Sequence, residues 1–467
     1  MKIQIRHYSA SLGLAALLLA HVAWAGQSAP LSDATDTPQP TAHSVATTTL
    51  ALDDAVAIAL SGNPGLAAMQ ARARALAEVP SQVGTLPDPT LSFGLLSVPT
   101  DTYSLSQEAM TQTQIGIGFT LPFPGKLGLR EQVAELEADT AGNDVDEKRL
   151  VLVRGVRSTW WNLFYLDHAL AIVQRNRSLL REFVSVAETK YKTGLGMQSD
   201  VLLAQVELSK LLDTEIAVRA SRRSQASALN ALLGRDANIA VALPQQANET
   251  LPPAPDSANL IKLAESSRPL IVSRRNTLAA ANDRTQLAEK DIYPDLRLGA
   301  SYGFRRDAPN GTTRADLASI TLNVNLPLFA GSRQDKAVSQ RRAEAQKEEY
   351  SLQDAKVQVG NEIEQAMAEY LAAREQASLY KSGIIPQASQ TAAAMMAAYQ
   401  VNKVDFLNLV RAQITLYNDE NQYWKTISAG WQAWARLESA VGTPLATLTA
   451  SDAATDSNKE NNNEQRQ

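Results

Sequence analysis

The sequence predicts a mainly α-helical fold with a small set of membrane β-strands, and three observations support this fold class. Two long segments, 126–192 and 332–400, carry apolar residues at the three- and four-residue spacing of a helix. Four short segments alternate apolar residues with small or polar ones, which is the period of a strand. The same order of elements occurs twice. We therefore expect very long antiparallel coiled helices, with two strands from each half of the chain.

The N-terminus has the pattern of an export signal. Lys2 and Arg6 precede an apolar run at 12–20, and Ala23-Trp24-Ala25 fits a cleavage site. We expect residues 1–25 to be a cleaved signal peptide and residues 26–49, rich in Ser, Thr and Pro, to be an N-terminal linker or arm. The chain contains no cysteine, so we expect neither a disulfide nor a lipid anchor on a cysteine.

The first half is expected at 50–234. Its first helix begins at Leu52, is interrupted near Asn63-Pro64 and ends near Val83. There follow, in order, a β-hairpin at 88–121, a joint with Pro122, Pro124 and Gly125, a long helix at 126–192 and a helix at 199–234. Ser199 or Asp200 is expected to cap the last of these helices, because short oxygen-bearing side chains accept from free N–H groups in a first helical turn.

The second half is expected at 257–442, after a proline-rich connection at 235–256. It contains, in order, a helix at 257–291 with Arg268-Pro269 in the place of Asn63-Pro64, a β-hairpin at 294–328, a joint with Pro327 and Gly331, a long helix at 332–400 and a helix at 404–441. Tyr191 aligns with Tyr399 where the helices turn, and Leu121-Pro122 aligns with Leu326-Pro327. Residues 443–467 are expected to be a disordered tail.

The hairpins predict a membrane sheet that is shared between chains. A strand of about ten residues crosses a bilayer when it is tilted by about 45°. The apolar residues of each strand fall on one face, and Gly, Ser, Thr, Asn and Arg fall on the other. Four strands cannot close a membrane barrel, which needs about eight, and an open sheet edge is not stable in lipid. The strands of several chains are therefore expected to close one barrel.

The duplicated halves, the Leu-Pro joints followed by glycine and the paired turns at Tyr191 and Tyr399 resemble the TolC family of outer-membrane efflux proteins. The likeness covers about residues 50–442. It implies a homotrimer in outer-membrane lipid, with a twelve-stranded β-barrel and a helical tunnel that crosses the periplasm. An adaptor of the periplasm with a single helical hairpin is the alternative from another class of protein.

The segment from Pro122 to Leu127 is most similar to the joint of the heavy-metal branch of that family, the CzcC and CusC type. This resemblance implies that a periplasmic adaptor and an inner-membrane pump of the RND type are partners, and that heavy-metal cations are exported. Efflux of drugs or organic solutes, or type I secretion, is the alternative. The lipidated members of the branch carry an anchoring cysteine that this chain lacks.

The resemblance also implies a gate where the helices turn, at the periplasmic end. In the family, residues at the positions of Asp200 and Tyr399 form part of a latch between subunits. The alternatives are that Asp200 is a helix N-cap and that Tyr399 is a packing residue. Drug-exporting members narrow their pore with two aspartates, whose positions hold Asn408 and Arg411 here. Asp405 is spaced to share their helix face, so this face either lines the pore or is simply solvated.

The sequence does not predict an enzyme. It contains no arrangement of a nucleophile with a base, no phosphate-binding loop and no metal-ligand cluster, so no catalytic, cofactor or metal residues are expected. Met197, Met395 and Met396 lie near the turns and could be soft-metal ligands, but methionine more often fills packing gaps. The formal net charge of −5 does not favour nucleic-acid binding.

Overall fold

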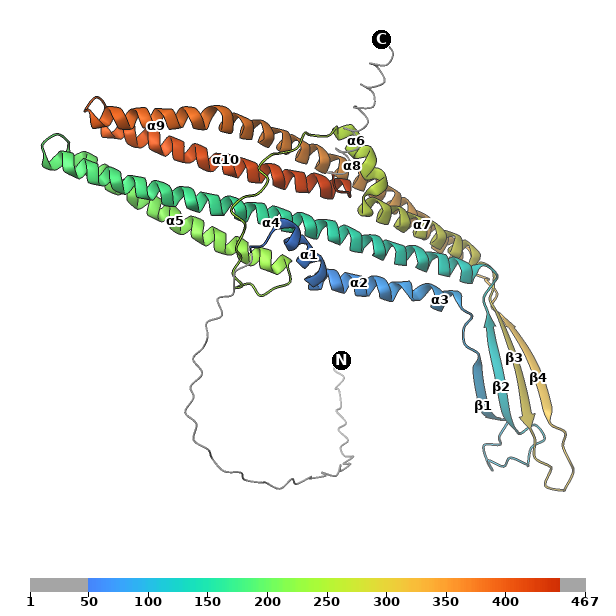
Figure 1. Cartoon of the computed structure of the whole chain (residues 1–467). Helices are drawn as coiled ribbons and strands as arrows, with labels where there is room; N and C mark the ends of the chain where they lie inside the picture. Colours follow the sequence, from blue (N-terminus) through green and yellow to red (C-terminus); the bar gives the residue numbers. More distant parts are fainter. Residues whose placement is uncertain (1–48, 446–467) are drawn as a thin grey trace, which may run out of the picture. The chain divides into compact units, whose positions relative to one another are not determined.

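A computed structural model describes residues 49–445 and confirms the predicted fold class, with long antiparallel helices and four antiparallel strands (Figure 1). The predicted signal peptide at 1–25, nearly all of the predicted arm at 26–49 and most of the predicted tail at 443–467 lie outside the described residues. The first half contains α1 (Leu52–Gly62), α2 (Pro64–Ala77), α3 (Val79–Gly84), β1 (Thr90–Leu96), β2 (Gln112–Leu121), α4 (Lys126–Lys192) and α5 (Gln198–Leu232). The second half contains α6 (Ser257–Ser267), α7 (Pro269–Lys290), β3 (Leu296–Phe304), β4 (Leu317–Val324), α8 (Gln334–Leu379), a π-helical segment (Tyr380–Ile384), α9 (Ile385–Gln400) and α10 (Phe406–Val441).

Prolines explain two helix breaks that the sequence analysis missed. The first helix was expected to run from Asn63-Pro64 to Val83, but α2 ends at Ala77 and α3 begins at Val79. Pro80 lies in the first turn of α3, where its missing N–H is not needed. The second long helix, expected at 332–400, begins at Gln334 and widens into the π-helical segment just before Pro386. A proline inside a regular helix would clash with the carbonyl four residues earlier.

Two further expectations were wrong in detail. The fourth strand ends at Val324 rather than near residue 328, because Pro327 has no N–H for a ladder and the N–H of Leu328 turns back to the carbonyl of Leu326 (2.9 Å). The N-cap of α5 is Met197, without a side-chain hydrogen bond, and Asp200 lies in the first helical turn. A carboxylate there is favourable for the helix dipole without acting as the cap.

The sheet has the order β1-β2-β3-β4, and every neighbouring pair is antiparallel. The pairing of β2 with β3 joins the two halves of the chain. Its register places Phe119 opposite Leu298 and Ile117 opposite Ala300. Among the described residues, β1 and β4 each have one edge without a partner strand.

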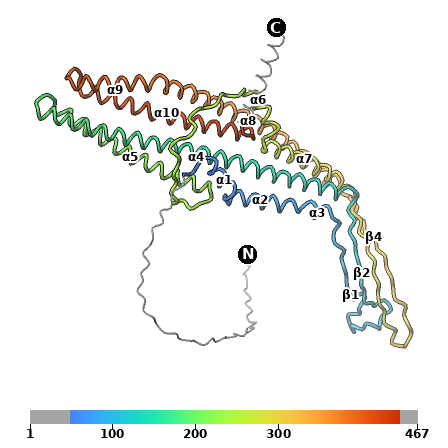
Figure 2. Tube along the Cα trace, in the orientation of Figure 1, coloured from blue at the N-terminus to red at the C-terminus, as the bar shows by residue number. Residues whose placement is uncertain are grey.

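Helix α4 is the element around which the other helices pack. The part of α4 that ends at Lys192 packs along α5, and the part that begins at Lys126 packs along α7 (Figure 2). Helix α4 also contacts α2 and α10. Its predicted apolar stripe is buried midway along the helix, where Trp160, Trp161 and Phe164 form an aromatic cluster with Trp424 and Trp431.

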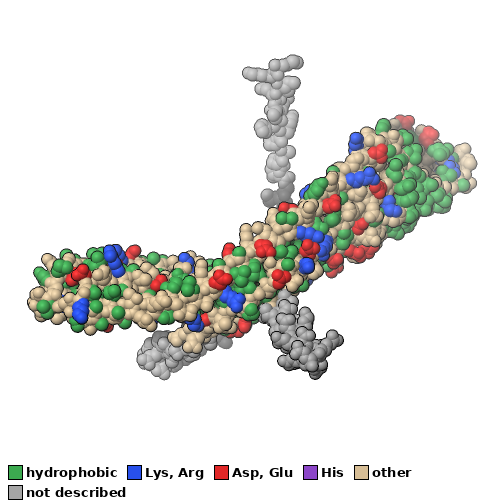
Figure 3. Space-filling model, turned by 90° about the horizontal axis from the view of Figure 1, so that it is seen from above, with side chains coloured by type: hydrophobic (Ala, Val, Ile, Leu, Met, Phe, Trp, Pro, Cys, Tyr) green, Lys and Arg blue, Asp and Glu red, His purple; other side chains and the backbone are tan. Residues whose placement is uncertain are grey.

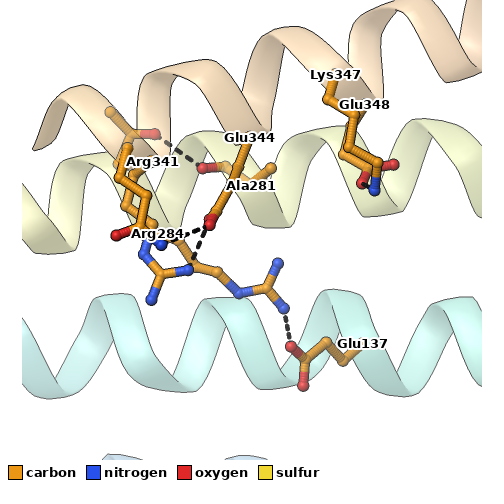
Figure 4. Close-up of polar contacts among 9 residues, drawn as sticks. Glu137, Ala281, Arg284, Arg341, Glu344, Lys347 and Glu348 are labelled. Atoms are coloured by element: carbon orange, nitrogen blue, oxygen red, sulfur yellow. Dashed lines mark hydrogen bonds and ion pairs between the residues drawn. The ribbon is translucent and has the colours of Figure 1, made fainter. Parts of the chain in front are cut away.

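Polar contacts join the helices near the sheet. Arg284 of α7 pairs with Glu137 of α4, and Glu344 of α8 accepts a hydrogen bond from Arg341 (Figure 4). No helix in residues 49–445 has the length and apolarity required to cross a membrane.

Candidate functional site

The four-stranded sheet has one continuous apolar face that nothing in the described chain covers. The strand register aligns its side chains in rows across the sheet, because residues opposite one another point to the same face. Those rows contain Leu91, Ile117, Ala300 and Ile320; Phe93, Ile115, Tyr302 and Ala318; Phe119, Leu298 and Leu322; and Leu121, Leu296 and Val324. Leu91, Phe93 and Ile320 are 77%, 76% and 84% exposed. Figure 3 shows hydrophobic side chains gathered at the end that carries the sheet. Such a face is suited to lipid or another apolar surface.

The opposite face of the sheet is polar and has small side chains. Ser92, Gly116, Ser301 and Ser319 form one row, and Thr90, Gly118, Gly299 and Thr321 form the next. Hydroxyls fill the space above the glycines: an added Cβ on Gly118 would lie 2.7 Å from the Oγ1 of Thr90. Gln114 donates to the hydroxyl of Ser301 (2.5 Å) across the contact between the two halves. This face can border water.

Aromatic residues border the apolar face at both ends, which the sequence analysis did not predict. At the loop end, the rings of Tyr302 and Phe304 lie 4.8 Å apart. At the helix end, Phe123 stacks on Tyr293 with their centroids 4.5 Å apart. Aromatic belts of this kind flank the lipid-facing band of membrane barrels, because their amphipathic rings are favourable at the membrane interface. Tyr302 and Phe304 continue the alternation of β3, whereas Phe123 and Tyr293 come from segments far apart in the sequence, so that their stacking could not be predicted.

Lys126 fastens the first strand–helix joint to the second half of the chain. Its side chain is 4% exposed, and its Nζ donates to the carbonyl of Tyr293 (2.9 Å) and to Asp295 (3.0 Å), while Asp291 lies at 3.3 Å. The carboxylate of Asp295 also accepts the N–H of Phe123 (2.9 Å). Burial opposes the charge of Asp295, but the Phe123 N–H and the ammonium of Lys126 outweigh burial and hold the pKa of Asp295 below its usual value.

The joint residues Pro122, Pro124 and Gly125 lie between β2 and α4, where they were expected. Gly125 precedes the first residue of α4 and has a φ of +84°, a left-handed conformation that favours glycine. A Cβ on Gly125 would lie 3.0 Å from the Nζ of Lys290. At the second joint, Pro327 and Gly331 lie between β4 and α8, and the joint residues Leu328 and Phe329 are 79% and 77% exposed.

The turns of the two helical hairpins contact each other at the far end of the helices. Lys190 of α4 donates from its Nζ to the carbonyl of Tyr399 (2.5 Å) and to the side chain of Asn402 (2.6 Å). The same ammonium lies 4.1 Å from the centre of the Tyr399 ring, within the range of a cation–π interaction. Lys190 was not among the predicted site residues, although it immediately precedes the aligned Tyr191.

Tyr399 is a buried packing residue in the single chain. It is 4% exposed and lies against Phe406 (5.3 Å between centroids), and its hydroxyl has no hydrogen-bond partner among the described residues. Burial, and secondarily the negative charge of Asp200, raise the pKa of Tyr399. The structure therefore brings Asp200 and Tyr399 into the same neighbourhood of one chain, without a direct hydrogen bond between them.

Asp405, Asn408 and Arg411 are exposed at the start of α10, where Asp405 is the N-cap residue. Asn408 and Arg411 are one helical turn apart and share a face, as their spacing predicted. Near them, Met395 and Met396 pack against the core that contains Phe406, whereas Met197 is exposed. The described residues contain no group of three or more His, Cys, Asp or Glu side chains that could hold a metal ion.

This architecture, in which paired long helices continue an open sheet with one apolar and one polar face, is that of a membrane-channel protein. The chain belongs to the outer membrane efflux protein family, whose model matches residues 55–235 and 260–443. The predicted resemblance to this family is confirmed. Its members are transport proteins rather than enzymes, and they form channels of the outer membrane.

Three known proteins illustrate the similarity. The cobalt-zinc-cadmium resistance protein CzcC of Cupriavidus metallidurans is 23% identical over 395 residues, which cover 84% of this chain and 90% of CzcC. The alkaline protease secretion protein AprF of Pseudomonas aeruginosa is 23% identical over 275 residues, which cover 57% of this chain and only 56% of AprF. The outer-membrane channel OprN has a similar fold, with a TM-score of 0.72 and 18% identity over 84% of this chain and 89% of OprN.

Proposed function

We propose that three copies of this chain form one closed outer-membrane barrel continued by a helical tunnel, and that this duct exports solutes received from an inner-membrane pump. The observation that carries the proposal is the exposed apolar face of a sheet with two unpaired edges. Lipid offers no hydrogen bonds to free strand edges, so such a sheet needs partner strands on both sides. Three four-stranded sheets supply twelve strands, which is enough to close a barrel.

The proposed assembly uses the two halves at 50–234 and 257–442 as repeats around the duct, joined by the connection at 235–256. The polar face of the sheet lines the lumen, with Arg297 and Asn323 opposite each other in one row. The turns at Lys190 and Tyr399 form the periplasmic end. There a periplasmic adaptor and a pump of the RND type are the proposed partners.

Heavy-metal cations are the proposed cargo. The joint from Pro122 to Leu127 is similar to that of the heavy-metal branch, and the alignment with the cobalt-zinc-cadmium resistance protein extends over 90% of that relative. Without a ligand cluster among residues 49–445, cations would pass through the duct without being held. Secretion or organic-solute efflux is the second candidate, and the name of AprF, an alkaline protease secretion protein, supports secretion.

We also propose that the turn region gates the periplasmic end. Asp405, Asn408 and Arg411 are exposed together on α10, and in a trimer this face is available to narrow the pore. Asp200 and Tyr399 are the proposed latch residues. The buried position of Tyr399 favours a latch that acts within the chain, through Lys190, over one in which its hydroxyl bonds a neighbouring subunit.

Deletion of the gene tests the cargo. Sensitivity to cobalt, zinc, cadmium, nickel, copper or silver, restored by the gene on a plasmid, is the expected result. Unchanged metal tolerance with new sensitivity to antibiotics would favour the second candidate. The duct itself is tested by extraction: the protein should be recovered from outer membranes as a species whose gel migration changes on heating, and recovery in the soluble periplasm would contradict the proposal.

A further inference from the structure

The internal repeat specifies how two copies of this chain join. In the proposed barrel, β4 of one copy lies beside β1 of the next copy. We propose the register of this antiparallel pairing, with Asn323 opposite Ser92 of the partner subunit, and we propose that Asp88 of the partner subunit forms the polar contact at the second strand–helix joint. The inference rests on the proposed trimer and goes beyond it by naming the register and the polar contact at the contact surface between subunits.

Two short motifs define how the halves correspond. Leu121-Pro122 matches Leu326-Pro327 at the end of the second strand of each hairpin, and Pro87-Asp88 matches Pro294-Asp295 before the first strand. By this correspondence Leu91 matches Leu298, and Ile117 matches Leu322. The structure pairs Leu91 with Ile117 in one hairpin and Leu298 with Leu322 in the other. The motifs therefore reproduce a register that they were not chosen to fit.

The same correspondence converts the observed pairing of β2 with β3 into the pairing of β4 with β1 of the next copy. The pair Phe119–Leu298 becomes Val324 with Leu91 of the partner subunit, and Ile117–Ala300 becomes Leu322 with Phe93 of the partner subunit. The pair Gly118–Gly299 becomes Asn323 with Ser92 of the partner subunit. Apolar residues then continue the apolar face and polar residues continue the polar face. A slip by one residue would reverse the faces.

The two joints differ in a way that this pairing explains. At the first joint, Asp295 accepts the N–H of Phe123 and the ammonium of Lys126. Leu328 occupies the place of Phe123 at the second joint, but its N–H donates to the carbonyl of Leu326 within a tight turn, and its side chain is 79% exposed. At the first joint, a carboxylate of the same chain binds the backbone N–H that follows the strand, whereas the second joint has no such carboxylate within the described chain.

An acidic and a basic side chain that could complete the second joint are present in the chain. Asp88, the counterpart of Asp295, has no hydrogen bond or ion pair within the described part of the chain. Arg333, beside the second joint at the start of α8, likewise has no ion pair among residues 49–445. Leu86, the counterpart of Tyr293, is 54% exposed. In the proposed pairing, the carboxylate of Asp88 of the partner subunit pairs with the Arg333 guanidinium, and the Leu328 N–H exchanges the carbonyl of Leu326 for this carboxylate. The charges of Asp88 and Arg333 are complementary.

Cysteine cross-linking tests the register, because the natural chain has no cysteine. The double variant Ser92→Cys and Asn323→Cys, oxidised in outer-membrane vesicles, should give disulfide-linked oligomers on non-reducing denaturing gels. The matched control is Leu96→Cys with Asn323→Cys, which uses the same face of β1 four residues further along and should give none. Cross-linking of the control pair but not of the Ser92 pair would overturn the proposed register.

A charge exchange tests the joint. Asp88→Arg and Arg333→Asp, made singly, should each lower the temperature at which the trimer dissociates on a gel, and the double variant should recover it. The control Asp101→Arg, in an exposed loop, should have no effect. Single variants equal to wild type, or a double variant no better than either single one, would overturn the contact. If the unmodified chain forms no trimer, the proposed function fails; if it forms a trimer without these effects, only the present inference fails.

Discussion

Replacing Lys126 with methionine tests the strand–helix joint with a nearly isosteric change. Methionine keeps the buried apolar stem of the lysine and removes the ammonium. The carbonyl of Tyr293 and the carboxylates of Asp291 and Asp295 then lose their shared partner, whose contacts are 2.9, 3.3 and 3.0 Å long. The N–H of Phe123 still reaches Asp295, so that carboxylate keeps one hydrogen bond.

The expected cost follows from the burial of each partner. Breaking a fully buried pair costs about 3–5 kcal/mol, and a hydrogen bond to a charged group contributes about 1.5–3 kcal/mol. The side chains of Asp291 and Asp295 are 53% and 34% exposed, so water compensates part of the loss. We therefore expect Lys126→Met to lower the free energy of unfolding by about 2–3 kcal/mol.

Guanidinium chloride unfolding in detergent, followed by circular dichroism, measures this loss. The midpoint of the variant should fall, and at an unchanged slope the shift converts directly to free energy. Lys262→Met is the matched control, since Lys262 is exposed on α6 and has no ion pair in the described region. A change within about 0.5 kcal/mol of the control would refute the role assigned to Lys126.

Three further predictions concern the same joint and the turns of the hairpins. The pKa of Asp295 is lowered in the folded state, so its contribution to stability is present above the unfolded pKa of about 3.9 and is lost as the pH falls through the lower folded pKa. The acid limb of a profile of unfolding free energy against pH should therefore be shallower in Asp295→Asn than in wild type. An identical acid limb would contradict this assignment. Lys190→Met should raise the single-channel conductance in planar bilayers, because it removes the 2.5 and 2.6 Å contacts between the two turns; unchanged conductance would remove Lys190 from the gate. Tyr399→Phe should change the unfolding free energy by less than about 0.5 kcal/mol, because the hydroxyl has no hydrogen-bond partner in the described structure. Tyr399→Ala should lower the unfolding free energy by about 3–5 kcal/mol, because it leaves a cavity. Similar losses in both variants would show that the hydroxyl is needed.

The strands and long helices could be predicted because their signals are local. Alternation in Ile115, Ile117 and Phe119 defines a face without any knowledge of the partner strand. The duplication added the chain order of the elements. The predicted positions of strand ends and helix breaks were less accurate. Pro80 and Pro386 act through backbone geometry, which the spacing of apolar residues does not describe.

The contacts that hold the site together were not predictable from the sequence. Lys126 and Asp295 are far apart along the chain, and each has many possible partners of opposite charge. Lys190 meets Tyr399 only because α4 and α9 end at the same level. Ser199 and Asp200 both had the residue type of an N-cap for α5, but the N-cap residue is Met197. Side-chain pairing depends on register and helix rotation, which local propensity does not determine.

The most direct test of the central claim measures which face of the sheet meets lipid. Single spin labels are placed along β2 at Gln114, Ile115, Gly116, Ile117, Gly118 and Phe119 in the protein reconstituted into lipid vesicles. Accessibility to oxygen, which partitions into lipid, should be high at the odd positions, and accessibility to a water-soluble nickel complex should be high at the even ones. Equal access of the nickel complex to both sets would contradict a sheet with one face in the membrane.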